Sequence, residues 1–192
     1  MRVTADHSGS GSRKLTRRRL LEAAVLSALA FGGSVAAIAR TRGYPRPAGL
    51  KLAALSPWQF AVVEHAARRI AAADRADDAT IPSPDEVGVA AFVDQWTARL
   101  PENVRRDLGR FLAYVEHIAP LGMGCVSRFT RLAAGEQDRV LASIESSSID
   151  LLRAGFDGLR SLVFLGFYRD PRTWSIVGYE GPLVGRPLSG WR

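Results

Sequence analysis

The chain has 192 residues, of which 47% are hydrophobic and 23% are charged, and it contains one cysteine. This composition excludes a wholly disordered or collagen-like chain, and the length favours one compact domain plus a tail or targeting segment. A single cysteine excludes an intrachain disulfide, a cysteine-rich zinc site and an iron–sulfur cluster. The net charge is +7, but residues 1–39 hold six Lys or Arg against two Asp or Glu. Because more than half of the excess charge lies there, we predict no nucleic-acid partner.

Residues 1–39 have the pattern of an export signal. A polar stretch leads to a basic cluster, and an uncharged apolar stretch, Ala23–Ala39, follows and ends in Ala37-Ile38-Ala39. A basic region, an apolar region and a small-x-small end together predict a secretory signal. The basic cluster resembles the twin-arginine (Tat) motif, Ser/Thr-Arg-Arg-x-Phe/Leu-Leu, with matches at Thr16, Arg17, Arg18, Leu20 and Leu21.

A single membrane anchor is the alternative interpretation of this segment. The stretch Ala23–Ala39 is short, is rich in Ala and Gly, and follows Glu22, all of which weaken a permanent span. Cleavage after Ala39 and retention as an anchor both stay open. Since the Tat pathway carries folded proteins, we expect a periplasmic protein that either binds a cofactor or travels with a partner that does.

The remainder predicts an all-α chain with a single helical domain. Residues 40–54 are rich in Pro and Gly and predict a linker. Apolar residues at helical spacing predict about five helices within the domain 55–167, over 56–73, 83–100, 101–115, 134–145 and 149–167. No segment alternates over enough residues to predict a strand. We expect Pro120 and residues 122–124 to interrupt the third helix.

Local signals support the helix starts and assign an apolar face to each helix. Ser56 with Gln59, and Ser83 with Glu86, are capping-box pairs, and a proline follows each serine. The apolar faces of the second and third helices comprise Val89, Phe92, Val93, Trp96 and Leu100, and Val104, Leu108, Phe111, Leu112 and Val115. We expect these faces to pack in the core.

Residues 168–192 form an extended C-terminal segment of a different kind. Gly and Pro recur in it, so we expect no helix there, yet it holds two tyrosines and two tryptophans. Two interpretations stay open: the rings complete the core, or they lie against another protein. The candidate interface residues are Tyr168, Asp170, Arg172, Trp174 and Tyr179.

No catalytic, cofactor-binding or metal-binding residue is predicted in this chain. His65 and His117 lack a second ligand at helical spacing, so we expect both to be exposed on helices. Cys125 lacks the motif that attaches a c-type haem, and no dinucleotide-binding motif follows a strand. As the one thiol of an exported chain, Cys125 either bridges to a partner or is buried as a small apolar residue.

Several of these segments together resemble a known family. The body is similar to the small subunit (subunit 3, or gamma) of membrane-linked sugar and alcohol dehydrogenases of the gluconate 2-dehydrogenase type. The likeness runs from Leu55 to Pro187 and departs at Arg169, where serine is common, and in the loosely patterned stretch 145–150. The matching pieces are Arg69-Ile70, Asp74, Ile81–Pro84, Gly88-Val89, Phe92–Asp94, Phe129, Leu132, Gly166–Arg172, Trp174 and Gly178–Pro182.

The resemblance implies a non-catalytic subunit that escorts a flavin-containing catalytic subunit of the glucose–methanol–choline type through the Tat translocase. FAD would then belong to the partner, and electrons would pass to a multihaem cytochrome c subunit or another acceptor. The alternative is a stand-alone, Tat-exported helical binding protein, either free or tethered to the membrane.

Overall fold

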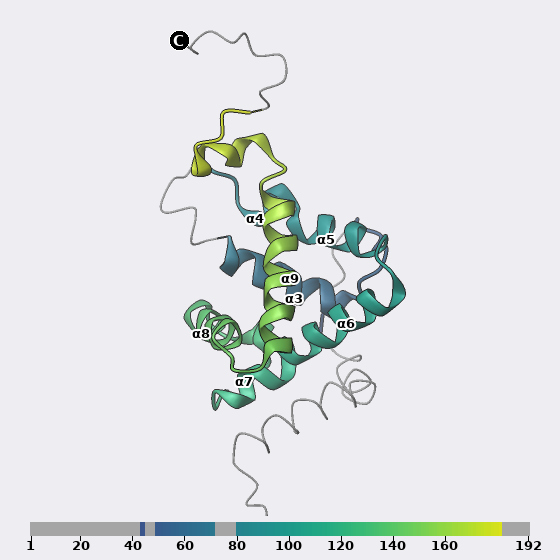
Figure 1. Cartoon of the computed structure of the whole chain (residues 1–192), viewed down its shortest axis with the longest axis vertical. Helices are drawn as coiled ribbons and strands as arrows, with labels where there is room; N and C mark the ends of the chain where they lie inside the picture. The colour runs from purple at the N-terminus through teal and green to yellow at the C-terminus, as the bar shows by residue number, and fades with distance from the viewer. Residues whose placement is uncertain (1–42, 45–48, 72–79, 182–192) are drawn as a thin grey trace, which may run out of the picture.

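The computed structural model describes residues 43–44, 49–71 and 80–181 (Figure 1). These residues are helical and contain no strand, which confirms the all-α fold class. None of the helices among them is long and apolar enough to cross a membrane. The predicted export signal, with Arg17, Arg18, Leu20 and Leu21, lies outside the described residues, as does the chain end from 182 to 192.

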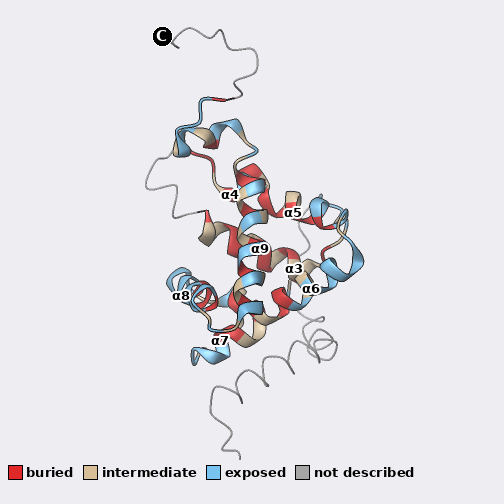
Figure 2. Cartoon of the chain, viewed as in Figure 1, coloured by how far each residue is buried: buried red, intermediate tan, exposed pale blue. Residues whose placement is uncertain are grey.

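Helix α9 runs the length of the domain, with α3 behind it, α8 on one side and α5 and α6 on the other (Figure 1). Buried side chains gather where α3 faces these helices, and the outer faces are exposed (Figure 2). The helices are α3 (Pro57–Ile70), α4 (Pro84–Val87), α5 (Val89–Thr97), α6 (Glu102–Ala113), α7 (Ala119–Gly122), α8 (Ala134–Glu145) and α9 (Asp150–Phe167). A π-helical turn η1 (Tyr114–Ile118) and two 3₁₀ turns, η2 (Phe129–Arg131) and η3 (Pro171–Val177), complete the elements.

The expected helix starts are present. The Gln59 side chain accepts a hydrogen bond from the backbone N–H of Ser56 at 2.8 Å, and α3 begins at the following proline. Ser83 and Glu86 form the reciprocal capping box at the start of α4. The expected second helix is divided in two because Gly88 adopts a left-handed conformation, φ 75°, between α4 and α5.

The third helix does not stop at Pro120, so that part of the prediction is wrong, whereas the predicted interruption at residues 122–124 is present. The segments α6, η1 and α7 follow one another directly and carry the helical path to Gly122. In the π turn the backbone N–H of Ala119 donates to the carbonyl of Tyr114, five residues back. Because this wider turn precedes Pro120 at the start of α7, the proline ring is accommodated without breaking the path.

The prediction of no helix after residue 168 is also wrong for one short segment, η3. Pro171 occupies its first position, and the Asp170 carboxylate accepts a hydrogen bond from the backbone N–H of Arg172 at 3.0 Å. Gly178 ends the turn in a left-handed conformation, φ 62°. Proline suits the first position and glycine the position after the end, so here they bracket a short helix.

Two buried carboxylates accept hydrogen bonds from parts of the predicted linker and so hold it against the helices. Asp94 on α5 is 2% exposed and accepts hydrogen bonds from the backbone N–H groups of Ala53, Ala54 and Leu55 at 2.7–2.9 Å. Three charge-assisted hydrogen bonds satisfy a carboxylate that burial would otherwise disfavour. The chain ahead of α3 therefore lies against the domain at residues 53–55.

Glu116, in η1, is fully buried and binds a second part of the linker. It accepts hydrogen bonds from the Tyr44 hydroxyl, from the Thr130 hydroxyl at 2.7 Å and from the Thr130 backbone N–H at 3.1 Å. The Arg128 guanidinium lies 4.1 Å from the Tyr44 ring centroid, with its Nε 3.7 Å from the carboxylate. Burial and the Glu116 carboxylate raise the pKa of the Tyr44 phenol.

Candidate partner-binding groove

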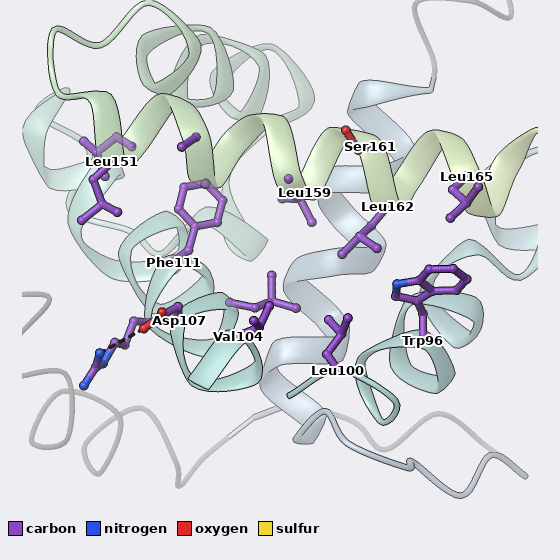
Figure 3. A pocket seen from close by; sticks show the side chains of 16 residues that line it. Trp96, Leu100, Val104, Asp107, Phe111, Leu151, Leu159, Ser161, Leu162 and Leu165 are labelled. Carbon is purple, nitrogen blue, oxygen red and sulfur yellow. Dashed lines mark hydrogen bonds and ion pairs between the residues drawn. The ribbon is translucent and has the colours of Figure 1, made fainter. Parts of the chain in front are cut away.

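An open apolar groove of about 710 Å³ lies between α9 and the pair α5 and α6. Figure 3 shows Trp96 from α5, Leu100 from the turn after α5, and Val104 and Phe111 from α6 on one side of the groove, with the leucines of α9 on the other. Four of its lining residues are unusually exposed for their type: Trp96 at 38%, Val104 at 41%, Leu151 at 54% and Leu165 at 48%. The groove is therefore an apolar surface that meets solvent.

Glycines of α9 shape the floor of the groove in two ways. A Cβ at Gly155 would lie 2.4 Å from the ring of Phe111, so the absence of a side chain lets this ring pack under α9. A Cβ at Gly158 would have no neighbour within 4 Å, because this position opens into the groove. The floor at Gly158 thus leaves room for the backbone or side chains of an occupant.

The chemistry of the lining favours an apolar protein segment over a small polar ligand. The polar side chains are Asp107, Arg110 and Ser161, and Asp107 is paired with Arg110 at 3.1 Å. Small-molecule sites normally combine an apolar wall with convergent polar groups that orient the ligand, and the groove lacks such a set. Apolar grooves between helices are a common receptor for amphipathic helices.

Both histidines of the domain are partly buried, which corrects the prediction that they are exposed. Gln137 donates a hydrogen bond to Nδ1 of His65 at 3.0 Å and another to the carbonyl of Phe129 at 3.0 Å. His117 lies beside Trp58, with ring centroids 6.2 Å apart, and its Nε2 is buried without a hydrogen-bond partner. Burial lowers the pKa of both imidazoles.

The candidate interface residues of the C-terminal segment form a small cluster at the end of α9. Tyr168 packs against the core, and its carbonyl accepts a hydrogen bond from Nε1 of Trp174 at 2.8 Å. The Tyr179 ring stands edge-on to Trp174, 4.9 Å between centroids, and is 45% exposed. Arg172 donates to both carboxylate oxygens of Asp170 and lowers the pKa of this carboxyl to about 2.

Cys125 does not belong to this cluster. It follows α7, near the opposite end of α9 from η3 (Figure 1), and is a partly exposed free thiol. The structure therefore separates the candidate interface residues into two places. A bridge from Cys125 to a partner stays a prediction.

Sequence reasoning missed the groove because it assigned Trp96, Leu100, Val104 and Leu108 to buried helix faces. Helical periodicity identifies an apolar face but not the element that covers it. One available signal was α9 itself, where Leu151 and Leu165 lie off the buried stripe of Leu152, Leu159 and Val163. A helix that is apolar on more than one face needs more than one covering surface.

Among the described residues, no group of three or more His, Cys, Asp or Glu side chains could hold a metal ion. No curated protein and no solved structure matches the chain. Residues 57–181 match the protein family described as gluconate 2-dehydrogenase subunit 3. The match covers the helices, the groove and η3, and so the chain belongs to the gluconate 2-dehydrogenase subunit 3 family.

Proposed function

We propose that this chain is the non-catalytic small subunit of a periplasmic FAD-dependent dehydrogenase complex and that the groove binds the catalytic subunit. The family description itself names a subunit of a dehydrogenase, so a catalytic partner is the natural occupant. The observation that carries the proposal is the exposure of Trp96, Val104, Leu151 and Leu165 around one groove. Burying these side chains against a partner removes apolar surface from water, at about 25 cal/mol per Å².

Further contacts connect the groove with the C-terminal cluster. The Phe92 ring lies 5.6 Å from the ring of Trp96, and the Arg169 guanidinium lies 5.1 Å from the Phe92 ring. Arg169 directly follows Tyr168, so aromatic and guanidinium groups continue from one end of the groove to the cluster. Aromatic residues and arginine are enriched at interface centres, which supports one continuous partner surface.

The remaining parts of the proposal concern export and electron transfer. The Tat motif would direct the folded complex to the periplasm, and the small subunit would escort a catalytic subunit without a signal of its own. FAD would be held by that partner, and a multihaem cytochrome c subunit would accept its electrons. Replacing Arg17 and Arg18 with lysine keeps the charge but removes the guanidinium groups, so periplasmic export of both subunits should be lost.

The binding proposal is tested by purifying the tagged chain from its native host and recording a flavin absorption spectrum of the eluate. We expect flavin to co-purify with the unaltered chain, and Leu165→Glu to reduce it at least about tenfold, because a carboxylate would be buried in an apolar interface. Leu121→Glu is the matched control, since Leu121 is 59% exposed on α7 and lies outside the groove.

Circular dichroism separates loss of binding from loss of fold in both variants. A flavin-free eluate from the unaltered chain would contradict the proposed partner and would favour a stand-alone binding protein. Equal loss of flavin in Leu121→Glu and Leu165→Glu would contradict the assignment of the groove as the binding surface.

A further inference from the structure

Before a partner is bound, the groove leaves an apolar surface open. The chain carries a second apolar element, the uncharged stretch Ala23–Ala39, which lies ahead of the described residues. Each element is unfavourable in water on its own, and packing one against the other would bury both. Whether they can meet depends on where the described chain begins and on the lengths involved.

The described chain begins against the helical path whose earlier part, α6, forms one wall of the groove. Tyr44 is held by Glu116, and the Gly43 carbonyl accepts a hydrogen bond from Arg128 at 3.4 Å. Glu116 lies in η1, which continues α6 directly, and Phe111 of α6 lines the groove. Five residues of helix separate Phe111 from Glu116, or about 7.5 Å along the axis at 1.5 Å per residue. The four residues between Ala39 and Tyr44 reach about 13 Å when extended.

The lengths of the two elements also agree. Along α9 the groove runs from Leu151 to Leu165, which is about 21 Å at the helical rise. The stretch Ala23–Ala39, if helical, would be about 25 Å long. One helix could therefore occupy the groove over its whole length.

The surfaces fit as well as the lengths. Position 158 is open, and small residues at 154 and 158 allow a second helix to come close to α9. The stretch Ala23–Ala39 is rich in alanine, and Leu26, Leu29 and Phe31 provide large apolar side chains. Small residues on both sides permit close helix approach, and the larger side chains would fill the space beside Trp96 and Phe111.

We propose that the apolar stretch of the export signal packs into the groove of its own chain until the catalytic subunit displaces it. The proposal rests on the proposed function, because the groove is taken as the partner-binding surface. Packed in this way, the signal is withheld from the translocase while the small subunit is alone. Binding of the partner releases the signal, so that export follows assembly.

Cross-linking tests the contact in the full chain, purified from the cytosol of cells that lack a Tat translocase. In a Cys125→Ser background, Ser34→Cys is paired with Gly158→Cys in the groove and, as a control, with Gly135→Cys on α8. Gly135 is a matched site because it is also helical and exposed, with no heavy atom within 4 Å of an added Cβ. We expect a short bismaleimide to link residues 34 and 158 within one chain, and this link to disappear when the catalytic subunit is added. Equal linking to residue 135, or no link to 158 while both thiols react with a monofunctional maleimide, would overturn the proposal.

Affinity for the catalytic subunit gives a second measurement. If the signal occupies the groove about 90% of the time, removing residues 1–39 should tighten the apparent affinity about tenfold, because every molecule is then competent. Leu165→Glu separates the claim that the groove binds the catalytic subunit from the claim that the signal occupies the groove beforehand. If Leu165→Glu abolishes binding and the truncation leaves affinity unchanged, the groove binds the partner and the signal does not occupy it. If Leu165→Glu binds normally, the proposed function itself fails.

Discussion

Two sides of the helical domain differ in whether another part of the chain covers them. On one side, Asp94 and Glu116 bind the segment ahead of α3 through its backbone N–H groups and the Tyr44 hydroxyl. On the other side, Trp96 and Leu165 stand partly exposed along a groove that no described residue covers. The chain thus closes one side with polar contacts of its own and leaves the other apolar and open.

This difference separates what stabilises the fold from what is left for binding. A buried carboxylate that accepts several hydrogen bonds needs donors at defined positions, which here come from the same chain. Removing a donor leaves the buried carboxylate partly unsatisfied, which costs folding stability. An apolar groove accepts any occupant of suitable shape, and its stabilisation appears only when the occupant arrives. We therefore expect substitutions on the closed side to change folding stability, and substitutions of the exposed apolar side chains of the groove to change assembly.

The largest effect is expected for Glu116→Ala on the closed side. The variant leaves the hydroxyls of Tyr44 and Thr130 and the backbone N–H of Thr130 without their acceptor, and it leaves Arg128 without a nearby negative charge. The free energy of unfolding should fall by about 3–5 kcal/mol, measured by urea denaturation. Glu102→Ala, at an exposed site on α6, should change it by about 0–1 kcal/mol. Similar losses in both variants would contradict a special role for the buried carboxylate.

A smaller effect on folding stability, opposite in sign at the two positions, is expected for two glycines of α9 that lie one turn apart. Gly155→Ala forces a methyl group against the ring of Phe111 and should destabilise the fold by about 1–3 kcal/mol. Gly158→Ala meets open space and should stabilise the helix by up to about 1 kcal/mol, because glycine is a poor helix former. Thermal unfolding of the two variants checks this. Equal destabilisation would mean that the groove floor is closed at both positions.

The smallest effect is a dependence of stability on pH at the partly buried histidines. Burial lowers the pKa of His65 and His117 below the unfolded value, so the unfolded chain binds more protons as the pH falls. The stability that the two neutral imidazoles contribute is fully present above the unfolded pKa of about 6.5. It is lost as the pH falls from there through the lower pKa values of the folded state. For His65 there is a structural reason: Nδ1 accepts from Gln137, which a protonated ring cannot do.

The corresponding measurement is the melting temperature between pH 7.5 and pH 5. It should decrease with acidification in the unaltered chain and decrease less in a His65→Gln, His117→Gln double variant. An unchanged slope in the double variant would assign the pH dependence to other groups.

The sequence allowed prediction of the local structure but not of contacts between distant segments. The helices 134–145 and 149–167 were expected within one residue of α8 and α9, because apolar spacing and caps act over a few residues. The role of Glu116 could not be predicted, because its donor Tyr44 is 72 residues away. The groove was missed for a related reason: the apolar residues of α5 and α6 are the same whether their faces are covered or open.

Protection of the groove by the catalytic subunit is the most direct test of the central claim. In a Cys125→Ser background, the thiol of Gly158→Cys should react with maleimide at least about tenfold more slowly in the purified complex than in the signal-free small subunit. The thiol of Gly135→Cys on α8 should react at the same rate in both. Equal reactivity of residue 158 in the free and bound chains would show that the partner binds elsewhere and would contradict the account.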